Sequence, residues 1–241
     1  MTNKAVVLAA GRGGRLERRT DRHAKGLVQV AGRPLIHHVL TALAQAGVRE
    51  VVLVVGYHGE QLQADLGDGQ RFGLKLHYVW NRDHTLGNAN SLWRALPLVK
   101  NEPFLLVMGD HLCSPSLLHT LLAGADGRSM LAIDRSELND EQSAEATKVA
   151  LVDGQVVDIS KQLKRWDAFD TGFSYWAPGA FASIADTPQN GELAVLMARL
   201  ARNGTGLEAR DISGHFWLDI DTEDDLRQAE RLLQANGHRL A

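Results

Sequence analysis

The chain has 241 residues, of which 44% are hydrophobic and 23% charged, a composition that suits one α/β domain with an ordinary buried core. Its net charge of −3 argues against a general nucleic-acid-binding protein, which is usually basic. The single cysteine, Cys113, excludes an internal disulfide, and no apolar run reaches the length of a membrane span. We therefore expect a cytoplasmic protein that binds neither nucleic acid nor a membrane.

The first half alternates between short apolar runs and helical patterns, which predicts parallel strands joined by helices. The predicted strands are 4–10, 50–56, 74–80, 103–108 and 130–134, and the predicted helices are 34–46, 59–66, 88–98 and 114–123. Pro34 suits a first helical position, and Gly47 suits a helix end. Ligands of such sheets bind beyond the carboxyl ends of the strands, so the loops after Ala10 and Met108 are the expected binding regions.

The second half has a different pattern. Segments 146–152 and 155–159 flank Asp153-Gly154, a strong hairpin signal. A further strand is predicted at 171–177 and helices at 191–203 and 222–235, the last beginning with a capping box from Thr222 to Asp225. We predict one domain over 1–241: a parallel half at about 1–134, a smaller antiparallel portion at about 135–218, and a segment at 219–241 whose helix packs on the sheet.

A glycine-rich turn follows the first strand. It reads Leu8-Ala9-Ala10-Gly11-Arg12-Gly13-Gly14-Arg15-Leu16, with Lys25 nine residues further on. Glycines let backbone N–H groups approach phosphate oxygens, and the three basic side chains would offset the charge of a triphosphate. The spacing fits neither a P-loop nor a dinucleotide fingerprint. From the chemistry alone, a glycine-rich turn with solvated arginines remains an alternative.

Together with Lys25 and Gly32-Arg33-Pro34, this turn resembles the signature of the nucleotidyltransferase superfamily. The resemblance implies an α/β fold with a Rossmann-like mixed, mostly parallel sheet flanked by helices, and a smaller antiparallel portion on the acceptor side. It also implies that the turn from Leu8 to Gly14 binds a nucleotide and that Arg15 and Lys25 are catalytic. Two positions depart from the usual pattern, because Gly14 stands where Ser or Thr is common and Ala24 where Pro is common.

Metal-binding carboxylates are implied by the same resemblance. Asp110 follows an apolar strand, and the matching aspartate of the superfamily holds Mg²⁺, which prefers one or two carboxylates plus phosphate oxygens. The segment 216–219 resembles the W-x-D segment of the superfamily and implies Asp219 as a second ligand. Asp221 lies two residues on and points the same way in an extended segment, although a role at the start of the next helix is an alternative. His111 is expected to be a hydrogen-bonding neighbour.

The loop after the predicted strand 74–80 matches the loop of the superfamily that contacts the nucleobase. Gly87 would permit close approach, while Asn88 and Ser91 would hydrogen-bond to the base. Capping of the following helix by Asn88 is the alternative.

The middle of the chain resembles inositol-1-phosphate cytidylyltransferases and phosphonate cytidylyltransferase domains over segments 145–149, 153–161 and 166–173. This resemblance implies that two lysines grip an acceptor phosphate and that three further residues line the acceptor pocket. The lysines are Lys148 and Lys161, and the lining residues are Asp170, Thr171 and Gly172. Without the resemblance, both lysines would be interpreted as solvated.

The resulting hypothesis is an enzyme that transfers CMP from CTP to a small phosphorylated polyol or a phosphonate and releases pyrophosphate, with Mg²⁺ as cofactor. A sugar-1-phosphate nucleotidyltransferase that uses UTP or dTTP is the alternative within the class. A glycosyltransferase-like or non-catalytic nucleotide-binding module is the alternative from another class. A homodimer, or a domain of a larger bifunctional chain, is consistent with the sequence.

Overall fold

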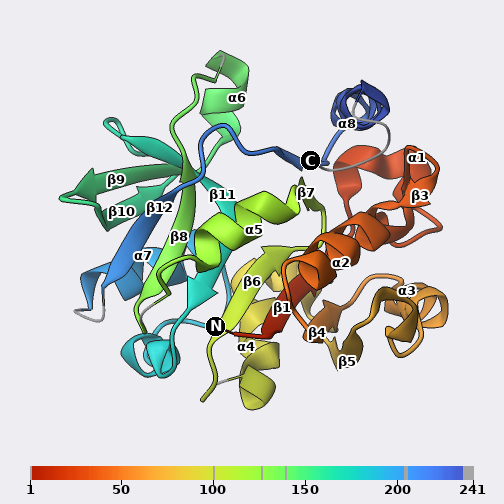
Figure 1. Cartoon of the computed structure of the whole chain (residues 1–241), viewed down its shortest axis with the longest axis horizontal. Coiled ribbons are helices and arrows are strands. Elements are labelled where there is room, and N and C mark those ends of the chain that lie inside the picture. The colour runs from red at the N-terminus through yellow and green to blue at the C-terminus, as the bar shows by residue number, and fades with distance from the viewer. Residues whose placement is uncertain (1, 100, 126, 139, 204–205, 236–241) are drawn as a thin grey trace.

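The computed structural model describes residues 2–99, 101–125, 127–138, 140–203 and 206–235 (Figure 1). Nine strands form the main sheet: β1 (Lys4–Ala9), β4 (Glu50–Val55), β5 (Lys75–Trp80), β6 (Phe104–Met108), β8 (Ser129–Asp134), β9 (Lys148–Val152), β10 (Gln155–Ser160), β11 (Ala168–Trp176) and β12 (Leu207–Asp211). Their order across the sheet is β5-β4-β1-β6-β11-β8-β12-β10-β9. The α/β class and the mixed sheet expected from the sequence are therefore confirmed.

Helices cover both faces of the sheet. One face carries α2 (Leu35–Gln45), α3 (Gly59–Leu66) and α5 (Pro115–Leu122), and the other carries α4 (Asn88–Val99) and α7 (Leu193–Arg202). Side chains alternate between the two faces of a strand. In β1, for example, Val6 belongs to the hydrophobic cluster that contains residues of α4 and α7, while Val7 belongs to the cluster that contains residues of α2, α3 and α5. The continuous apolar run of β1 follows from its central, doubly covered position.

Strand direction divides the sheet. Neighbouring strands among β5, β4, β1 and β6 are parallel, whereas β11 runs antiparallel to both β6 and β8. β9 pairs with β10 on one side and with β11 on the other, so β11, β8, β12, β10 and β9 close into a ring of five strands. These strands gather on one side of the molecule in Figure 1, away from β5. Strand β12 is parallel to β8, so the second half is not wholly antiparallel.

Shorter elements connect these layers. They are the helices α1 (Glu17–Thr20) and α6 (Asp140–Glu145), the strands β2 (Gln29–Val30), β3 (Arg33–Pro34), β7 (His111–Cys113) and β13 (Trp217–Asp219), and the 3₁₀ turns η1 (Gly14–Leu16), η2 (Lys25–Leu27), η3 (Gln70–Phe72), η4 (His84–Leu86) and η5 (Ala180–Ile184). The predicted hairpin is confirmed as β9 and β10, with positive φ at Asp153 and Gly154. Helix α2 starts one residue later than predicted, because Pro34 is extended and pairs with Gln29.

The last helix, α8 (Glu223–Ala235), does not pack on the main sheet as expected. Its apolar side joins a separate cluster with Leu16, Val30 and Ile220, because the faces of β1 are already covered by other helices. The predicted capping box is confirmed: Asp225 N–H donates to Thr222 Oγ1 at 3.2 Å, and Thr222 N–H donates to the Asp225 carboxylate at 2.7 Å. The division at about 134 and 218 stays a prediction, and residues 236–241 lie outside the described part.

Within the residues that the structure describes, no helix combines the length and hydrophobicity that a membrane span needs. The expected cytoplasmic location stays a prediction.

Candidate active site

The glycine turn after β1 wraps around the stem of Lys25. Gly13 has a φ of 69°, and a Cβ at this position would lie 2.8 Å from Lys25 Cδ, so only glycine fits there. The Thr20 hydroxyl donates to the Gly13 carbonyl at 3.0 Å and holds the turn. Around Gly11 and Gly14, by contrast, no described atom lies within 4 Å of the Cβ position. The turn is therefore tight against the lysine and open elsewhere.

Ala24 stands where proline is common in the superfamily, and a hydrogen bond fixes its backbone in place of a proline ring. Its backbone N–H donates to Gln61 Oε1 at 3.0 Å, and proline has no N–H to donate. The Ala24 φ of −59° is nevertheless the value that proline would fix. The hydrogen bond to Gln61 of α3 thus fixes Ala24, the residue before Lys25.

Lys25 connects the glycine turn to two carboxylates. Its Nζ lies 2.6 Å from Asp110 Oδ2 and 2.7 Å from Asp221 Oδ1. Lys25 is only 8% exposed. Burial by itself would lower its pKa, but the two carboxylates outweigh that effect and raise the pKa above its ordinary value. The lysine therefore stays charged at neutral pH.

Two short strands bring the acidic residues together. Asp110 follows β6 through Gly109, where a Cβ would lie 2.8 Å from the Ala9 side chain and where glycine therefore lets the chain pass close to β1. β7 then pairs antiparallel with β13, and Asp219 is opposite His111 in the register. This pairing joins the loop after β6 to a segment from near the C-terminus.

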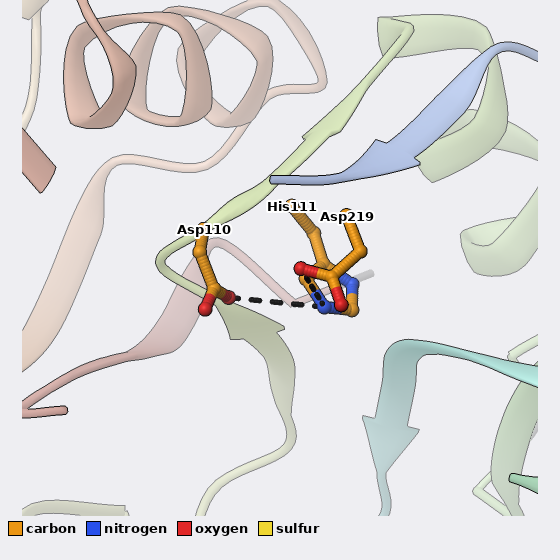
Figure 2. Close-up of side chains that lie close together, drawn as sticks. All are labelled: Asp110, His111 and Asp219. Carbon is orange, nitrogen blue, oxygen red and sulfur yellow. Dashed lines mark ion pairs between the residues drawn. The ribbon is translucent and has the colours of Figure 1, made fainter. Parts of the chain in front are cut away.

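Asp110, His111 and Asp219 form a group that could hold a metal ion (Figure 2). Their candidate ligand atoms all lie within 4.8 Å of one another. His111 Nε2 is 3.7 Å from Asp110 Oδ1 and 3.4 Å from Asp219 Oδ1, and its Nδ1 is 2.9 Å from the Thr171 carbonyl. The contact with the carbonyl assigns a proton to Nδ1 and leaves Nε2 facing the carboxylates.

The donor atoms of this group fit a divalent cation. Oδ1 of Asp110 and Oδ1 of Asp219 are both buried and have no hydrogen-bond partner among the described residues. Buried carboxylate oxygens are normally paired or coordinate metals. A hard cation such as Mg²⁺ takes oxygen ligands of this kind.

The charged groups of the site shift one another's pKa values. Burial raises the pKa of Asp219 to about 7, and Asp110 and Asp221 add to this effect while His111 opposes it. Burial also acts to raise the pKa of Asp110, but Lys25 and His111 together with the hydrogen bonds to its carboxylate outweigh this effect and lower that pKa. Asp219 is thus the acid of the group that ionises near neutral pH, where a bound cation would favour its charged form.

Arg15 and Asp221 form a second pair beside the first. One guanidinium nitrogen of Arg15 contacts Asp221, and the other lies 2.7 Å from Glu145 Oε2 at the end of α6. The Asp221 carboxylate therefore contacts both basic side chains, and it lies outside the three-residue group that could hold a metal. The N-terminus of α8 is capped by Thr222 and Asp225 instead. A metal-binding role for Asp221 stays a prediction.

The predicted base loop is bound to the start of α7. A Cβ at Gly87 would lie 2.1 Å from the Gly191 carbonyl oxygen, so the two backbones pass in close contact. Asn88 Oδ1 accepts a hydrogen bond from the Leu193 N–H at 2.5 Å and so satisfies an end of α7, not of its own helix. Ser91 is buried and accepts a hydrogen bond from Asn81 at 2.9 Å. Base recognition by Asn88 and Ser91 stays a prediction.

The predicted acceptor residues lie on the ring of five strands. The Lys148 ammonium donates to the carbonyls of Ser143 at 2.7 Å and of Lys161 at 3.0 Å, and it lies 5.2 Å from the centre of the Trp166 ring. Lys148 is buried, whereas the Lys161 side chain is exposed. The two predicted lysines are therefore neighbours. Among the described residues, Lys148 has two hydrogen-bond acceptors for its three N–H groups, so one N–H can donate to a ligand.

The other three acceptor residues form an irregular part of β11, where the register with β8 shifts. Gly172 has a φ of 78°, and a Cβ there would lie 2.5 Å from His111. Thr171 is fully buried and donates to the Ala132 carbonyl at 2.9 Å, so its hydroxyl is used inside the fold. Burial raises the pKa of Asp170, and its carboxylate accepts from Gly172 N–H at 2.8 Å. Gly172 thus makes room for His111.

Sequence reasoning did not assign Glu145 to the site and gave His111 only a supporting role. His111 follows Asp110 directly, and the sequence signal that could have placed it near Asp219 is a three-residue strand, which is too short for a periodicity argument. Glu145 contacts Arg15 from the distant helix α6, and nothing in the local sequence predicts that contact.

A fold and a site of this kind define a nucleotidyltransferase. The chain matches the model of the MobA-like NTP transferase domain over residues 5–202, and it belongs to this family.

Two curated relatives and one solved structure are similar to this chain over most of its length. The "Bifunctional IPC transferase and DIPP synthase" of Aquifex aeolicus is 32% identical over 234 residues, which are 97% of this chain and 52% of the relative. The "CMP-5'-(3-aminopropyl)phosphonate synthase" of Streptomyces rubellomurinus is 35% identical over 245 residues, covering 94% of this chain and 38% of the relative. Among solved structures, the inositol-1-phosphate CTP transferase from T. maritima has a TM-score of 0.84 and 26% identity, and the match covers 100% of this chain and 98% of that one. The chain spans about half the length, or less, of these two curated relatives.

Proposed function

We propose that this protein is a cytidylyltransferase that transfers CMP from CTP to a small phosphorylated polyol, such as an inositol phosphate, or to a phosphonate. One observation carries the proposal: Lys25 from the glycine turn lies 2.6 Å from Asp110, whose carboxylate is grouped with that of Asp219. Basic groups for a phosphate chain and carboxylates for a cation therefore meet in one place. The cytidine preference and the two acceptor classes rest on the names of the phosphonate synthase and of the inositol-1-phosphate CTP transferase.

Asp110 and Asp219 would hold a Mg²⁺ ion. Three carboxylates (Asp110, Asp219 and Asp221) face the two basic side chains of Arg15 and Lys25, so a divalent cation compensates the excess negative charge. When bound, the ion would neutralise charge on the phosphates of the nucleotide. Mg²⁺ prefers oxygen ligands and near-octahedral geometry, which favours the two carboxylates over the His111 nitrogen.

The reaction needs no general base. A phosphate monoester has its second ionisation near pH 6, so the acceptor is mainly a dianion at neutral pH. One of its oxygens attacks the α-phosphorus of CTP in line. As the new P–O bond forms, the bond between the α-phosphorus and the oxygen that bridges to the β-phosphate breaks. Pyrophosphate leaves with the electron pair of that bond.

The side chains then supply position and charge. We assign Lys25 and Arg15 to the phosphate chain, where they offset negative charge on the reacting and departing groups. Both side chains already contact carboxylates, so the phosphate chain competes with Asp221 and Glu145 for them. On the acceptor side, we assign Lys148 and Lys161 to the acceptor phosphate, and Asp170 and Gly172 to the remainder of the acceptor.

A screen for pyrophosphate release tests the proposal. CTP, UTP, dTTP, ATP and GTP are each combined with inositol phosphates, sugar 1-phosphates and small phosphonates, in the presence of Mg²⁺. We expect release with CTP and an inositol phosphate or phosphonate, and a much slower release from Lys25→Met. Release with UTP or dTTP and a sugar 1-phosphate would favour the alternative within the class. Nucleotide binding without release from any acceptor would favour a non-catalytic module.

A further inference from the structure

Tyr57 contacts the phosphate side of the proposed nucleotide site at three points. It lies two residues beyond the end of β4, and its backbone N–H donates to the Ala10 carbonyl at 3.0 Å. Its hydroxyl donates to the Asp21 carbonyl at 3.2 Å, and its ring centre lies 5.6 Å from Cζ of Arg12. Arg12 in turn pairs with the Asp21 carboxylate at 3.1 Å. Tyr57 therefore supports both the glycine turn and the segment that follows it.

The same ring also reaches the base side of the site. The ring centres of Tyr57 and His84 are 6.0 Å apart, with an angle of 57° between the planes. His84 belongs to η4, which ends at Leu86, directly before Gly87 of the predicted base loop. Its Nδ1 is buried and has no hydrogen-bond partner among the described residues. A buried polar atom without a partner is uncommon in folded proteins and marks a place where a ligand can supply the missing contact.

We propose that Tyr57 and His84 form the wall of the nucleoside subsite, on which the base and ribose of the bound nucleotide pack. The inference rests on the proposed function, which places the triphosphate at the glycine turn and the base at Gly87. Tyr57 contacts Arg12 of the glycine turn and His84 beside the base loop, so its ring lies between the two points that the nucleoside joins. Aromatic rings suit this role because every nucleobase presents a flat π-face to stack on.

Arg12 explains how the ring becomes available. Its planar guanidinium packs on the Tyr57 ring and pairs with Asp21, and the side chains of Arg12 and Asp21 are both more than half exposed to solvent. A phosphate chain at the glycine turn competes with Asp21 for this cation, because phosphate is an anion of higher charge. As Arg12 turns to the phosphates, the nucleoside takes its place against the ring.

The experiment compares two ligands that differ only by the nucleoside. CTP and inorganic tripolyphosphate are titrated, with Mg²⁺, into the wild-type protein and into Tyr57→Ala, Tyr57→Phe and His84→Ala by calorimetry. We expect Tyr57→Ala to weaken CTP binding by about tenfold, within the range for a lost base–aromatic contact, and to change tripolyphosphate binding by less than about twofold. Tyr57→Phe keeps the ring and loses the hydroxyl bond to Asp21, so it should bind CTP nearly as the wild type does. His84→Ala should weaken CTP selectively as well.

Tyr78→Ala is the matched control, because Tyr78 lies on β5 and its hydroxyl bonds to Gly67, away from the glycine turn. Equal losses for CTP and tripolyphosphate in Tyr57→Ala would show that the ring only shapes the turn, and would overturn the proposal. Unchanged CTP binding in both Tyr57→Ala and His84→Ala would overturn it too. If Tyr57→Ala fails to fold, the test rests on His84→Ala: a selective loss of CTP binding supports the proposal, and unchanged CTP binding overturns it. A wild-type protein that binds tripolyphosphate but no nucleoside triphosphate contradicts the proposed function instead.

Discussion

Asp219 pairs with His111 across β13 and β7, and this pairing places its carboxylate 3.4 Å from the imidazole. Strand β13 is also fixed to the main sheet, because the Trp217 indole N–H donates to the Asp134 carboxylate of β8 at 2.7 Å. The group that could hold a metal therefore depends on two three-residue strands whose positions are fixed by neighbouring side chains.

Removal of either carboxylate from this group should weaken metal binding. We expect Asp110→Asn and Asp219→Asn each to lower the affinity for Mn²⁺, measured by calorimetry without nucleotide, by about tenfold or more, because each loses one charge close to the ion. Asp221→Asn should have a smaller effect, because that carboxylate contacts Lys25 and Arg15. An equal loss in Asp221→Asn would show that Asp221 is a ligand as well.

Lys25→Met should affect both activity and stability. Loss of the ammonium removes a charge that we assign to the reacting phosphates, and the rate of pyrophosphate release should fall by about 10²- to 10³-fold. The variant also leaves the Asp110 carboxylate without its ammonium partner and leaves Asp221 paired with Arg15 alone, so the free energy of unfolding in urea should fall by up to about 3–5 kcal/mol. Lys75→Met, on the exposed surface of β5, is the control and should change neither quantity. Full turnover in Lys25→Met would remove Lys25 from the mechanism.

Gly14→Ser should improve nucleotide binding. No described atom lies within 4 Å of the Cβ position, and the Gly14 φ is not positive, so stability should change by less than about 0.5 kcal/mol. A hydroxyl there can donate to a phosphate oxygen, which should lower the KM for CTP by about threefold. Gly13→Ser is the contrasting variant, because its side chain would collide with Lys25, and it should lose both stability and activity. An increased KM in Gly14→Ser would contradict the expected contact.

Glu145→Gln should raise the affinity for CTP. Glu145 contacts Arg15 at 2.7 Å and so competes with the phosphate chain. Exposed ion pairs contribute at most about 1 kcal/mol, so the dissociation constant should fall by no more than about fivefold, and less at high salt. Glu137→Gln, another exposed glutamate, should leave the affinity unchanged. Weaker CTP binding in Glu145→Gln would mean that Glu145 supports Arg15 rather than competing for it.

The pKa of Asp219 gives a pH dependence of stability. Its value of about 7 in the folded protein lies above the ordinary 3.8, so between these values the folded chain binds more protons than the unfolded chain. Stability therefore falls as the pH rises through this window. In buffer with EDTA, Asp219→Asn should raise the Tm at about pH 8, and this gain should shrink toward about pH 4. A gain that is the same at both pH values would show that Asp219 does not titrate in this window.

The parallel half of the fold could be predicted from the sequence because its strands and helices carry clear periodicities. The apolar run of β1 and the Asp153-Gly154 turn are local signals, and the structure confirms both. The position of Asp110 follows from the rule for carboxyl ends of strands.

The second half of the fold and the contacts within the site depend on residues far apart in the sequence, which no local pattern predicts. β12 has only two apolar residues, Leu207 and Ala209, an alternation too short to predict a strand, and it is recognised only by its pairing with β8. The contacts of Asp219 with His111, and of Arg15 with Glu145, join segments far apart in the chain. The resemblance to the superfamily supplied Asp219, whereas Tyr57 and His84 needed the ring geometry of the structure.

Closure of the five-strand ring has a consequence for self-association. Because β9 pairs with β11 at Lys148 and Val149, β5 is the only strand of the main sheet within the described residues that has a strand partner on one side alone. Unpaired strand margins are where protein chains add to one another through backbone hydrogen bonds. β5, away from the ring, is therefore the margin of the main sheet that offers a second copy an unpaired strand along its whole length.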